Sequence, residues 1–151
     1  MPATRPDELA ARLREVGLRV TGPRVAVLSV LADRAHVDVE TVRGAVHSQL
    51  GGVSTQAVYD VLRAFTAAGL VRRIEPAGRP ALFETRTGDN HHHIVCRSCG
   101  TVADIDCVVG AAPCLEPSSA PPGFAVDEAE VTFWGVCTDC QSKNREGNDH
   151  I

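Results

Sequence analysis

Apolar residues recur at helical spacing along the first half of the chain. Leu9, Leu13 and Val16 mark one face of a first helix, which the segment "GLRVTGPR" interrupts. Thr21 then suits the N-cap of a second helix, with Pro23 in its first turn. The pattern therefore predicts two consecutive helices, the second ending at about residue 33.

Two further helices are predicted by the same reasoning. Asp38 and Ser54 are suitable N-caps, and Gly69 is a suitable end for the fourth helix. The apolar stripes behind these caps consist of Val39, Val42 and Val46 in one helix and of Val58, Val61, Leu62 and Phe65 in the other.

A predicted β-hairpin follows the fourth helix. Residues 70–74 and 81–85 are β-prone runs, and the turn-forming segment "PAGRP" separates them. Helices closed by a hairpin are typical of the winged helix-turn-helix. We therefore predict that residues 1–85 form a winged-helix DNA-binding domain, with the fourth helix in the major groove.

The fourth helix carries a polar face opposite its apolar stripe. Gln56, Tyr59 and Arg63 share this face and suit base edges and phosphates, and Arg19 is a further candidate DNA contact. A polar face alone is equally typical of an ordinary surface helix. The order of helices and hairpin, and three arginines around the hairpin, favour DNA.

The second half of the chain has a different pattern. The polar, turn-prone "RTGDN" predicts a hinge at residues 86–90. Three strand-like segments follow, "HHIV", "TVADI" and "EVTFWGVC", and the irregular stretch between the last two has room for one helix. We expect residues 91–151 to form a small α/β dimerisation domain with a mobile polar tail from residue 142, which makes the whole chain α+β.

Charge and hydropathy narrow the choice of partner. The net charge is -4, but residues 1–90 carry twelve Arg against ten acidic residues, whereas residues 91–151 carry three basic and nine acidic residues. This asymmetry favours an anionic partner for the first half only. The longest apolar run, residues 25–32, is too short to span a membrane, and the charged start of the chain is unlike a secretory signal. We expect a cytoplasmic protein without a membrane partner.

Four of the six cysteines form two C-x-x-C pairs, Cys96 with Cys99 and Cys137 with Cys140, separated by 37 residues. In a reducing compartment such pairs favour metal ligation over disulfides or unliganded thiols. Four thiolates suit a tetrahedral Zn2+ with no open position, which is a structural site. Cys107 and Cys114 lie outside both pairs and are either a redox pair or small apolar residues.

Three consecutive histidines precede the first cysteine pair. On a strand His91 and His93 share a face and His92 points away, and the returning strand can bring Asp104 beside them. Imidazole with carboxylate suits Fe2+, Mn2+ or Zn2+, so a second metal site is one interpretation. An exposed histidine-rich strand is the other, and His92 is left without a role.

Several segments together carry a family resemblance. "GLRVTGPRVAVL", "AVYDVLRAFTAAGLV", "FET", "HHHIVCRSCG" and the terminal C-x-x-C lie between about residue 8 and residue 140. In combination they closely resemble the ferric uptake regulator superfamily of bacterial metal-dependent repressors, and in particular its peroxide-sensing and catalase-repressor branch.

The resemblance implies a hinge between the two domains, a structural zinc held by the four cysteines, and a regulatory Fe2+ or Mn2+ between the domains. The regulatory ligands that it implies are His36, Glu84, His91, His93 and Asp104. Two departures from the family pattern stand out. Asn90 and Ala129 replace ligands of a third metal site found in some relatives, so we expect no intact third site. Asp60 stands directly after Tyr59 of the fourth helix, where many relatives have Arg.

The function implied is a repressor that binds double-stranded operator DNA as a homodimer when its regulatory metal is bound. Asp104, where iron-level sensors often have Glu, favours release by peroxide through oxidation of His36 or His91, with a catalase-type defence gene as the target. An iron-responsive or zinc-responsive repressor is the alternative. A metalloenzyme is not expected, because the chain has no recognisable general-base or nucleophile motif and five protein ligands leave little room for substrate.

Overall fold

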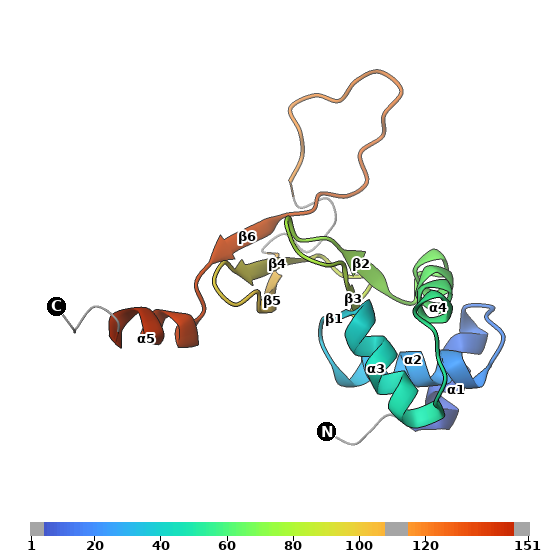
Figure 1. Ribbon diagram of the computed structural model, residues 1–151. Coiled ribbons are helices and arrows are strands. Elements are labelled where there is room, and N and C mark those ends of the chain that lie inside the picture. The colour runs from blue at the N-terminus through green and yellow to red at the C-terminus, as the bar shows by residue number, and fades with distance from the viewer. Residues whose placement is uncertain (1–4, 108–114, 147–151) are drawn as a thin grey trace. The chain divides into compact units, whose positions relative to one another are not determined.

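The computed structural model describes residues 5–107 and 115–146 (Figure 1). The chain divides between Thr87 and Gly88 into two compact units, which we call the first unit and the second unit. This boundary falls within residues 86–90, where the sequence predicts a hinge. No helix in the described residues is long and apolar enough to cross a membrane.

The first unit contains four helices and three short strands. All four predicted helices are present. Their bounds are Pro6–Glu15 (α1), Gly22–Asp33 (α2), Val39–Leu50 (α3) and Thr55–Ala67 (α4), and the strands are Val37–Asp38 (β1), Arg72–Ile74 (β2) and Leu82–Glu84 (β3).

The three predicted N-caps are confirmed by their hydrogen bonds. Each cap side chain accepts a bond from the backbone N–H three residues later, which satisfies a donor that the helix itself leaves unpaired. The bonds are Thr21 from Arg24 at 3.3 Å, Asp38 from Thr41 at 2.7 Å and Ser54 from Ala57 at 3.1 Å.

Gly69 ends α4, as predicted, and turns the chain toward the hairpin of β2 and β3, residues 72–84, which we call the wing. Its φ of +73° lies in the left-handed region that glycine adopts without strain. Its N–H donates to the carbonyl of Thr66 at 3.1 Å, and the N–H of Leu70 donates to the carbonyl of Phe65 at 2.9 Å. These two bonds form a Schellman motif, which satisfies the last carbonyls of the helix.

The predicted hairpin is confirmed as the antiparallel pair β2 and β3, with a register in which Arg73 faces Phe83. On its other side β3 pairs with β1, where Val37 faces Phe83, so the strand order is β1-β3-β2. The sequence did not predict β1, because two residues are too few to show the alternation typical of a strand.

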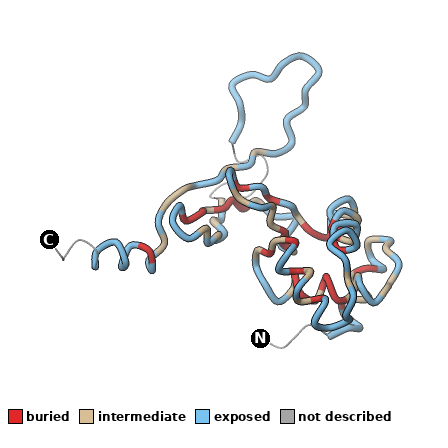
Figure 2. Tube along the Cα trace, in the orientation of Figure 1, coloured by how far each residue is buried: buried red, intermediate tan, exposed pale blue. Residues whose placement is uncertain are grey.

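The core of the first unit lies between its helices and the wing. Figure 2 shows buried residues in red along α2 and in stretches of the other helices. From α4 the core receives Val58, Leu62 and Phe65, which are three of the four positions predicted as its apolar stripe; Val61 is partly buried against them. Packing of this face holds the opposite face of α4 toward solvent.

The second unit is built on a three-stranded sheet. The strands are His91–Cys96 (β4), Val102–Asp106 (β5) and Thr132–Gly135 (β6), in the order β5-β4-β6. β4 pairs antiparallel with β5 and parallel with β6. The three predicted strands are therefore present.

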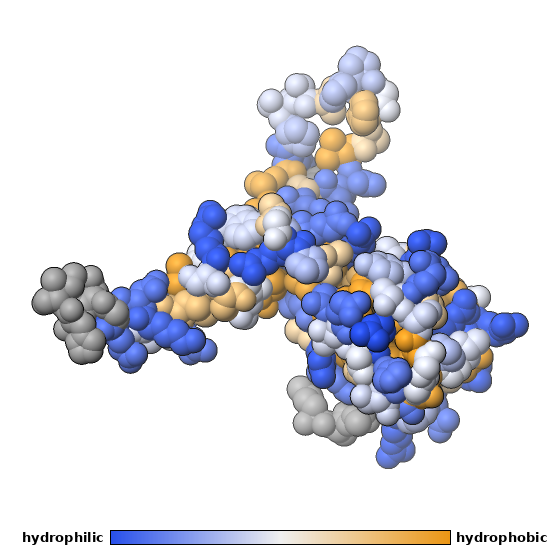
Figure 3. Space-filling model, viewed as in Figure 1, coloured by the Kyte–Doolittle hydropathy of each residue, from blue (hydrophilic) through white to orange (hydrophobic). Residues whose placement is uncertain are grey.

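The helix of the second unit is not where the sequence analysis expected it. Residues 115–131 contain no helix, and residues 108–114 lie outside the described residues. Instead α5 spans Thr138–Glu146, so the expectation of a mobile tail from residue 142 is wrong as far as Glu146. The helix has no apolar periodicity because its side chains are hydrophilic, which Figure 3 shows in blue, and Cys140 is its one buried described residue.

Candidate metal centres and DNA-reading surface

The two cysteine pairs of the second unit come together at one place. Cys96 ends β4 and Cys99 follows in the next turn, whereas Cys137 and Cys140 flank the start of α5. All four sulfur atoms lie within 4.8 Å of one another. The Sγ atoms of Cys99 and Cys137 are 3.7 Å apart. Four sulfurs at about 2.3 Å from one tetrahedral Zn2+ would be about 3.8 Å apart, so the donors fit that ion.

Hydrogen bonds around the sulfurs favour the thiolate form of the first pair. The backbone N–H of Cys137 donates to Cys96 Sγ at 3.3 Å, and this bond is the main cause that lowers the pKa of Cys96 to about 6. The Thr101 hydroxyl, 3.0 Å from Cys99 Sγ, lowers the pKa of Cys99. In contrast, the hydrogen bond between the Cys140 and Cys137 side chains raises the pKa of Cys140 to about 12. Crowded sulfurs of this kind hold their full negative charge only beside a cation.

The sheet explains how two distant cysteine pairs meet. Parallel pairing of β4 with β6 sets Cys96 opposite Gly135, two residues before Cys137. The N–H of Arg97 donates to the carbonyl of Gly135 at 2.8 Å, and the Arg97 guanidinium lies 5.3 Å from the centre of the Trp134 ring. These contacts directly join the segments that carry the two cysteine pairs.

A second group of donors lies on one face of the same sheet. His93 faces Asp104 across the β4–β5 pair, as predicted. The Nε2 atoms of His91 and His93 are 3.7 and 3.4 Å from Asp104 Oδ1, and the two rings meet edge to face with centres 4.9 Å apart. All three histidines of β4 are buried, which contradicts the interpretation of an exposed histidine-rich strand.

Asp89 orients one of these histidines, and the sequence analysis did not identify it. Its Oδ1 is 2.6 Å from Nδ1 of His91. A carboxylate at this distance accepts a hydrogen bond from Nδ1–H, and in that tautomer the lone pair of Nε2, the atom nearer Asp104, is available to a metal. An acidic residue two positions before the first histidine was the only signal in the sequence.

The first unit holds a separate pair of donors. His36 precedes β1 and Glu84 ends β3, so the pairing of these two strands brings them together. His36 Nε2 is 3.2 Å from Glu84 Oε2, and the Glu84 side chain is 1 % exposed. A carboxylate this deeply buried needs a positive partner, which a protonated imidazole or a metal supplies.

The five residues implied as regulatory ligands thus occur as two assembled groups. One is His36 with Glu84 in the first unit, and the other is His91 with His93 and Asp104 in the second. His92 lies on the other face of β4 and remains without an assigned role. The expected lack of a third site stays a prediction. Cys107 is half-buried and Cys114 lies outside the described residues, so their pairing is also untested.

The side chains predicted as DNA contacts are exposed. Gln56, Tyr59 and Arg63 all lie on the solvent face of α4, and Arg19 is exposed in the segment between α1 and α2. The carbonyl of Arg19 accepts a bond from Nη1 of Arg24 at 2.9 Å, which links this segment to α2. These positions are open to a partner.

Asp60 connects two of these contacts. Its Oδ1 accepts a hydrogen bond from Nε2 of Gln56 at 2.9 Å and lies 3.7 Å from Nη1 of Arg63. The three residues follow one another at i, i+4 and i+7, which places them along one line of the helix surface.

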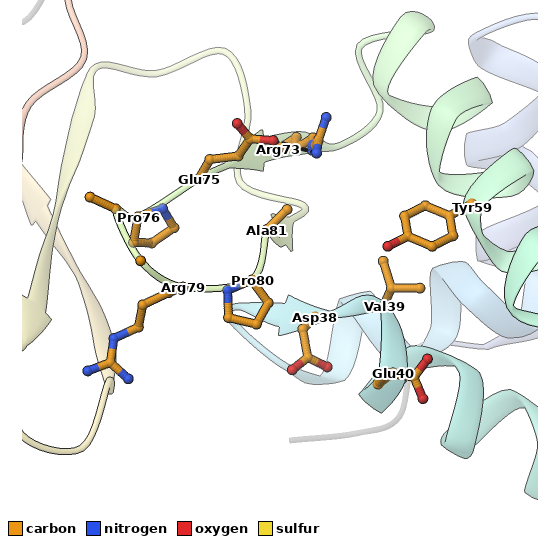
Figure 4. Close-up of a pocket in the computed structure, with 12 residues that line it drawn as sticks. Asp38, Val39, Glu40, Tyr59, Arg73, Glu75, Pro76, Arg79, Pro80 and Ala81 are labelled. Atoms are coloured by element: carbon orange, nitrogen blue, oxygen red, sulfur yellow. Dashed lines mark ion pairs between the residues drawn. The ribbon is translucent and has the colours of Figure 1, made fainter.

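Tyr59 also lines a cavity of about 480 Å³ between α4 and the wing. Figure 4 shows its hydroxyl on the side of this space, near Val39 at the start of α3. The opposite walls come from the start of α3 and from the wing, where Arg73 forms an ion pair with Glu75. Side chains of α4, α3 and the wing therefore line one surface.

Comparisons with known proteins agree with these features. A family profile described as "Ferric uptake regulator family" matches residues 15–109. Over 133 residues the chain is 60% identical to "Transcriptional regulator FurA" of Mycobacterium tuberculosis, covering 88% of this chain and 90% of that protein. It is 54% identical to "Ferric uptake regulation protein 1" of Mycolicibacterium fortuitum, covering 84% of this chain and 78% of that protein.

Solved structures show the same fold. The ferric uptake regulator of Helicobacter pylori, described as having three functional metal binding sites, has a TM-score of 0.67 at 17% identity and covers 92% of this chain and 95% of its own. The ferric uptake regulator of Pseudomonas aeruginosa with manganese has a TM-score of 0.62 at 28% identity and covers 86% and 98%. The names of these proteins support the family and do not single out its peroxide-sensing branch.

Proposed function

Because the chain belongs to the ferric uptake regulator family, we propose that it is an iron-responsive transcriptional repressor that binds operator DNA as a homodimer in the cytoplasm. The observation that carries this proposal is the presence of assembled imidazole and carboxylate donors, of which His91, His93 and Glu84 are buried, in a chain whose named relatives are ferric uptake regulators.

We assign two metals to this function. Cys96, Cys99, Cys137 and Cys140 would hold a structural Zn2+, because their sulfurs have the spacing of a tetrahedral site. His36, Glu84, His91, His93 and Asp104 would hold the regulatory Fe2+ or Mn2+, because mixed nitrogen and oxygen donors suit borderline divalent ions. Manganese in the Pseudomonas aeruginosa relative supports this choice.

The regulatory ligands come from both units of the chain, and this supplies the mechanism. Residues 86–90 would act as the hinge. When all five side chains bind one ion they restrict the placement of the DNA-reading helix, and a dimer has only one spacing that fits successive major grooves. By linkage, operator DNA and the regulatory metal must each raise the affinity for the other.

DNA titrations test this proposal. Protein that retains its zinc but lacks the regulatory metal is loaded anaerobically with Mn2+ or Fe2+. DNA binding is then measured by fluorescence anisotropy. We expect loading to tighten binding about 5- to 150-fold, the usual range of allosteric coupling. Substitutions His91→Ala and Glu84→Ala should remove this gain without loss of zinc.

His47→Ala is the matched control, because His47 is an exposed histidine of α3 outside the proposed ligand set. Its DNA binding should respond to metal as in the wild type. Equal DNA affinity with and without the regulatory metal would reject the repressor mechanism proposed above.

Release by peroxide is a second candidate, and the observation that favours it is Asp104. The resemblance associates aspartate at this position with peroxide sensors, and its carboxylate lies 3.4 Å from His93 and 3.7 Å from His91. Bound Fe2+ would supply the one-electron reduction of peroxide, and His36 and His91 are the side chains expected to be oxidised. The relatives' ferric-uptake names support the iron-responsive alternative instead.

Peroxide treatment separates the two candidates. Protein loaded with Fe2+ or with Mn2+ is treated with peroxide on DNA, and peptides containing His36 or His91 are analysed by mass spectrometry. Loss of DNA binding with added oxygen in the Fe2+ sample only would support peroxide sensing. Retained binding without added oxygen leaves the iron-responsive repressor as the function.

A further inference from the structure

The exposed face of α4 carries a carboxylate between two of its three DNA-reading candidates, Gln56 and Arg63. Asp60 lies one turn after Gln56 and one turn before Arg63, and its side chain is 59 % exposed. One oxygen, Oδ1, serves both neighbours, at 2.9 Å from the amide nitrogen of Gln56 and 3.7 Å from Nη1 of Arg63. Asp60 therefore links Gln56 and Arg63 in one line of contacts along the helix.

The hydrogen bond to Asp60 orients the amide of Gln56. Because Nε2 donates one of its two hydrogens to Asp60, the amide keeps one N–H and its Oε1 for a DNA base. A donor and an acceptor side by side match N7 and N6 of adenine in the major groove. Gln56 is thus prepared for an adenine before DNA arrives.

Asp60 itself presents only acceptors to the groove. The exposed hydrogen-bond donors of the major groove are the N4 amino group of cytosine and the N6 amino group of adenine. In adenine the acceptor N7 is adjacent to N6 and would repel a carboxylate, whereas in cytosine the neighbouring group is an apolar C–H. The chemistry of Asp60 therefore fits cytosine better than the other three bases.

We propose that Asp60 is a specificity-determining residue that accepts a hydrogen bond from the N4 amino group of one cytosine in each half-site. This inference rests on the proposed function of α4 as the DNA-reading helix. Arg63 has a supporting role, because its guanidinium offsets the negative charge that Asp60 brings close to the phosphates.

The same charge gives Asp60 a second effect. A carboxylate near the DNA backbone weakens binding to every sequence, since nonspecific affinity depends on the net number of phosphates neutralised. Asp60 therefore raises discrimination at one base pair and lowers affinity for random DNA. A carboxylate on this helix face that contacts no base would have only the second of these effects.

Selection from a random DNA library tests the proposal. Full-length protein, loaded with zinc and Mn2+, is compared as wild type, Asp60→Asn, Asp60→Ala and the control Asp33→Asn. Asp33 is an exposed carboxylate at the end of α2, so its substitution removes the same charge away from α4. Binding to a fixed non-operator duplex is measured alongside.

We expect the wild type to select cytosine at one position of each half-site, with roughly tenfold preference, the usual cost of one mismatched base pair. Asp60→Asn should change this preference to adenine, because asparagine pairs with both N6 and N7. Asp60→Ala should lose preference at that position and weaken the preference for adenine at the position that Gln56 reads, because the Gln56 amide loses its hydrogen bond to Asp60. Both variants should bind non-operator DNA more tightly than Asp33→Asn does.

The possible failures are distinguishable. If the wild type enriches no sequence at all, the proposed function fails and the inference about Asp60 fails with it. If the wild type enriches a site and Asp60→Asn shows the same base preferences at every position, only the inference about Asp60 is overturned. The same holds if the position that changes is not a cytosine.

Discussion

The two units of this chain bury opposite kinds of side chain. The first unit buries Leu, Val and Phe side chains from all four helices in one continuous core. The described part of the second unit buries three histidines and two cysteines with Val95, and it leaves several large apolar side chains exposed: Leu115, Phe124, Val126, Phe133 and Val136. Orange atoms near β6 in Figure 3 belong to this exposed apolar surface.

The difference indicates different sources of stability. Helices of the first unit pack on one another and remove apolar surface from water, which is sufficient to hold a small domain together. The second unit has one sheet and a helix whose buried residue is Cys140. In the proposed function, a structural zinc and a second copy would compensate for the few buried apolar residues in the described part of this unit.

Of the tests of this comparison, zinc removal should produce the largest difference in stability between the two units. Structural zinc contributes about 10 to 16 kcal/mol of binding free energy in small zinc domains, so its loss should unfold the second unit. We expect Cys137→Ser, or strong chelation, to abolish hydrogen-exchange protection in β4, β5 and β6 and to leave α1 to α4 protected. Cys107→Ser is the control, and simultaneous loss of protection in both units would refute the comparison.

Phe65→Ala should have the converse effect. Phe65 is fully buried in the first core, and truncation of a buried Phe costs about 3 to 5 kcal/mol because it leaves a cavity. Denaturant unfolding monitored by helical circular dichroism should show this loss, while the zinc content stays unchanged. Thr66→Ala, at an exposed neighbouring position, should change stability by less than about 0.5 kcal/mol.

Phe133→Ser tests whether a second copy covers the exposed apolar surface. Phe133 is 47 % exposed on β6, and a buried aromatic anchor at an interface is typically worth about 2 kcal/mol or more. Sedimentation equilibrium should therefore show a dimer weakened by at least about tenfold. Leu50→Ser, which changes an equally exposed apolar residue of the first unit, should leave the dimer intact.

Asp89→Ala should weaken the regulatory metal without loss of zinc. Loss of a carboxylate that orients a ligand histidine typically costs about 10- to 100-fold in metal affinity. Competition titrations with Mn2+ measure this, and nitrogen NMR of His91 should show that Nδ1 no longer keeps the proton. Asp89→Asn should retain part of the affinity because its Oδ1 still accepts. Asp127→Ala is the control, and an equal loss there would exclude a specific role for Asp89.

Ser54→Ala should produce the smallest change. Its hydroxyl accepts from the N–H of Ala57 at 3.1 Å at the start of α4, and loss of an N-cap costs about 1 kcal/mol. Thermal unfolding of the first unit should record this decrease. Ser48→Ala, inside α3, should leave the melting temperature nearly unchanged, because alanine is the better helix former.

The helices of the first unit were predictable because their signals are local. Caps at Thr21, Asp38 and Ser54 and a glycine stop at position 69 each depend on residues within about one turn. The link between Gln56 and Asp60 is also local, at i and i+4, and could have been read from the same helical spacing. β1 and α5 were missed because one is too short and the other too polar to show periodicity.

The sequence by itself determined the residue types of both metal groups, the spacing of the cysteine pairs and the face shared by His91 and His93, since these follow from chain chemistry and strand alternation. The return of the next strand also predicted Asp104 beside these histidines, but only the tertiary structure decided which of the more distant donors meet. Parallel pairing of β4 with β6 joins cysteine pairs that are 37 residues apart, and pairing of β1 with β3 joins His36 to Glu84. Such contacts depend on strand register between distant segments, which no local pattern specifies.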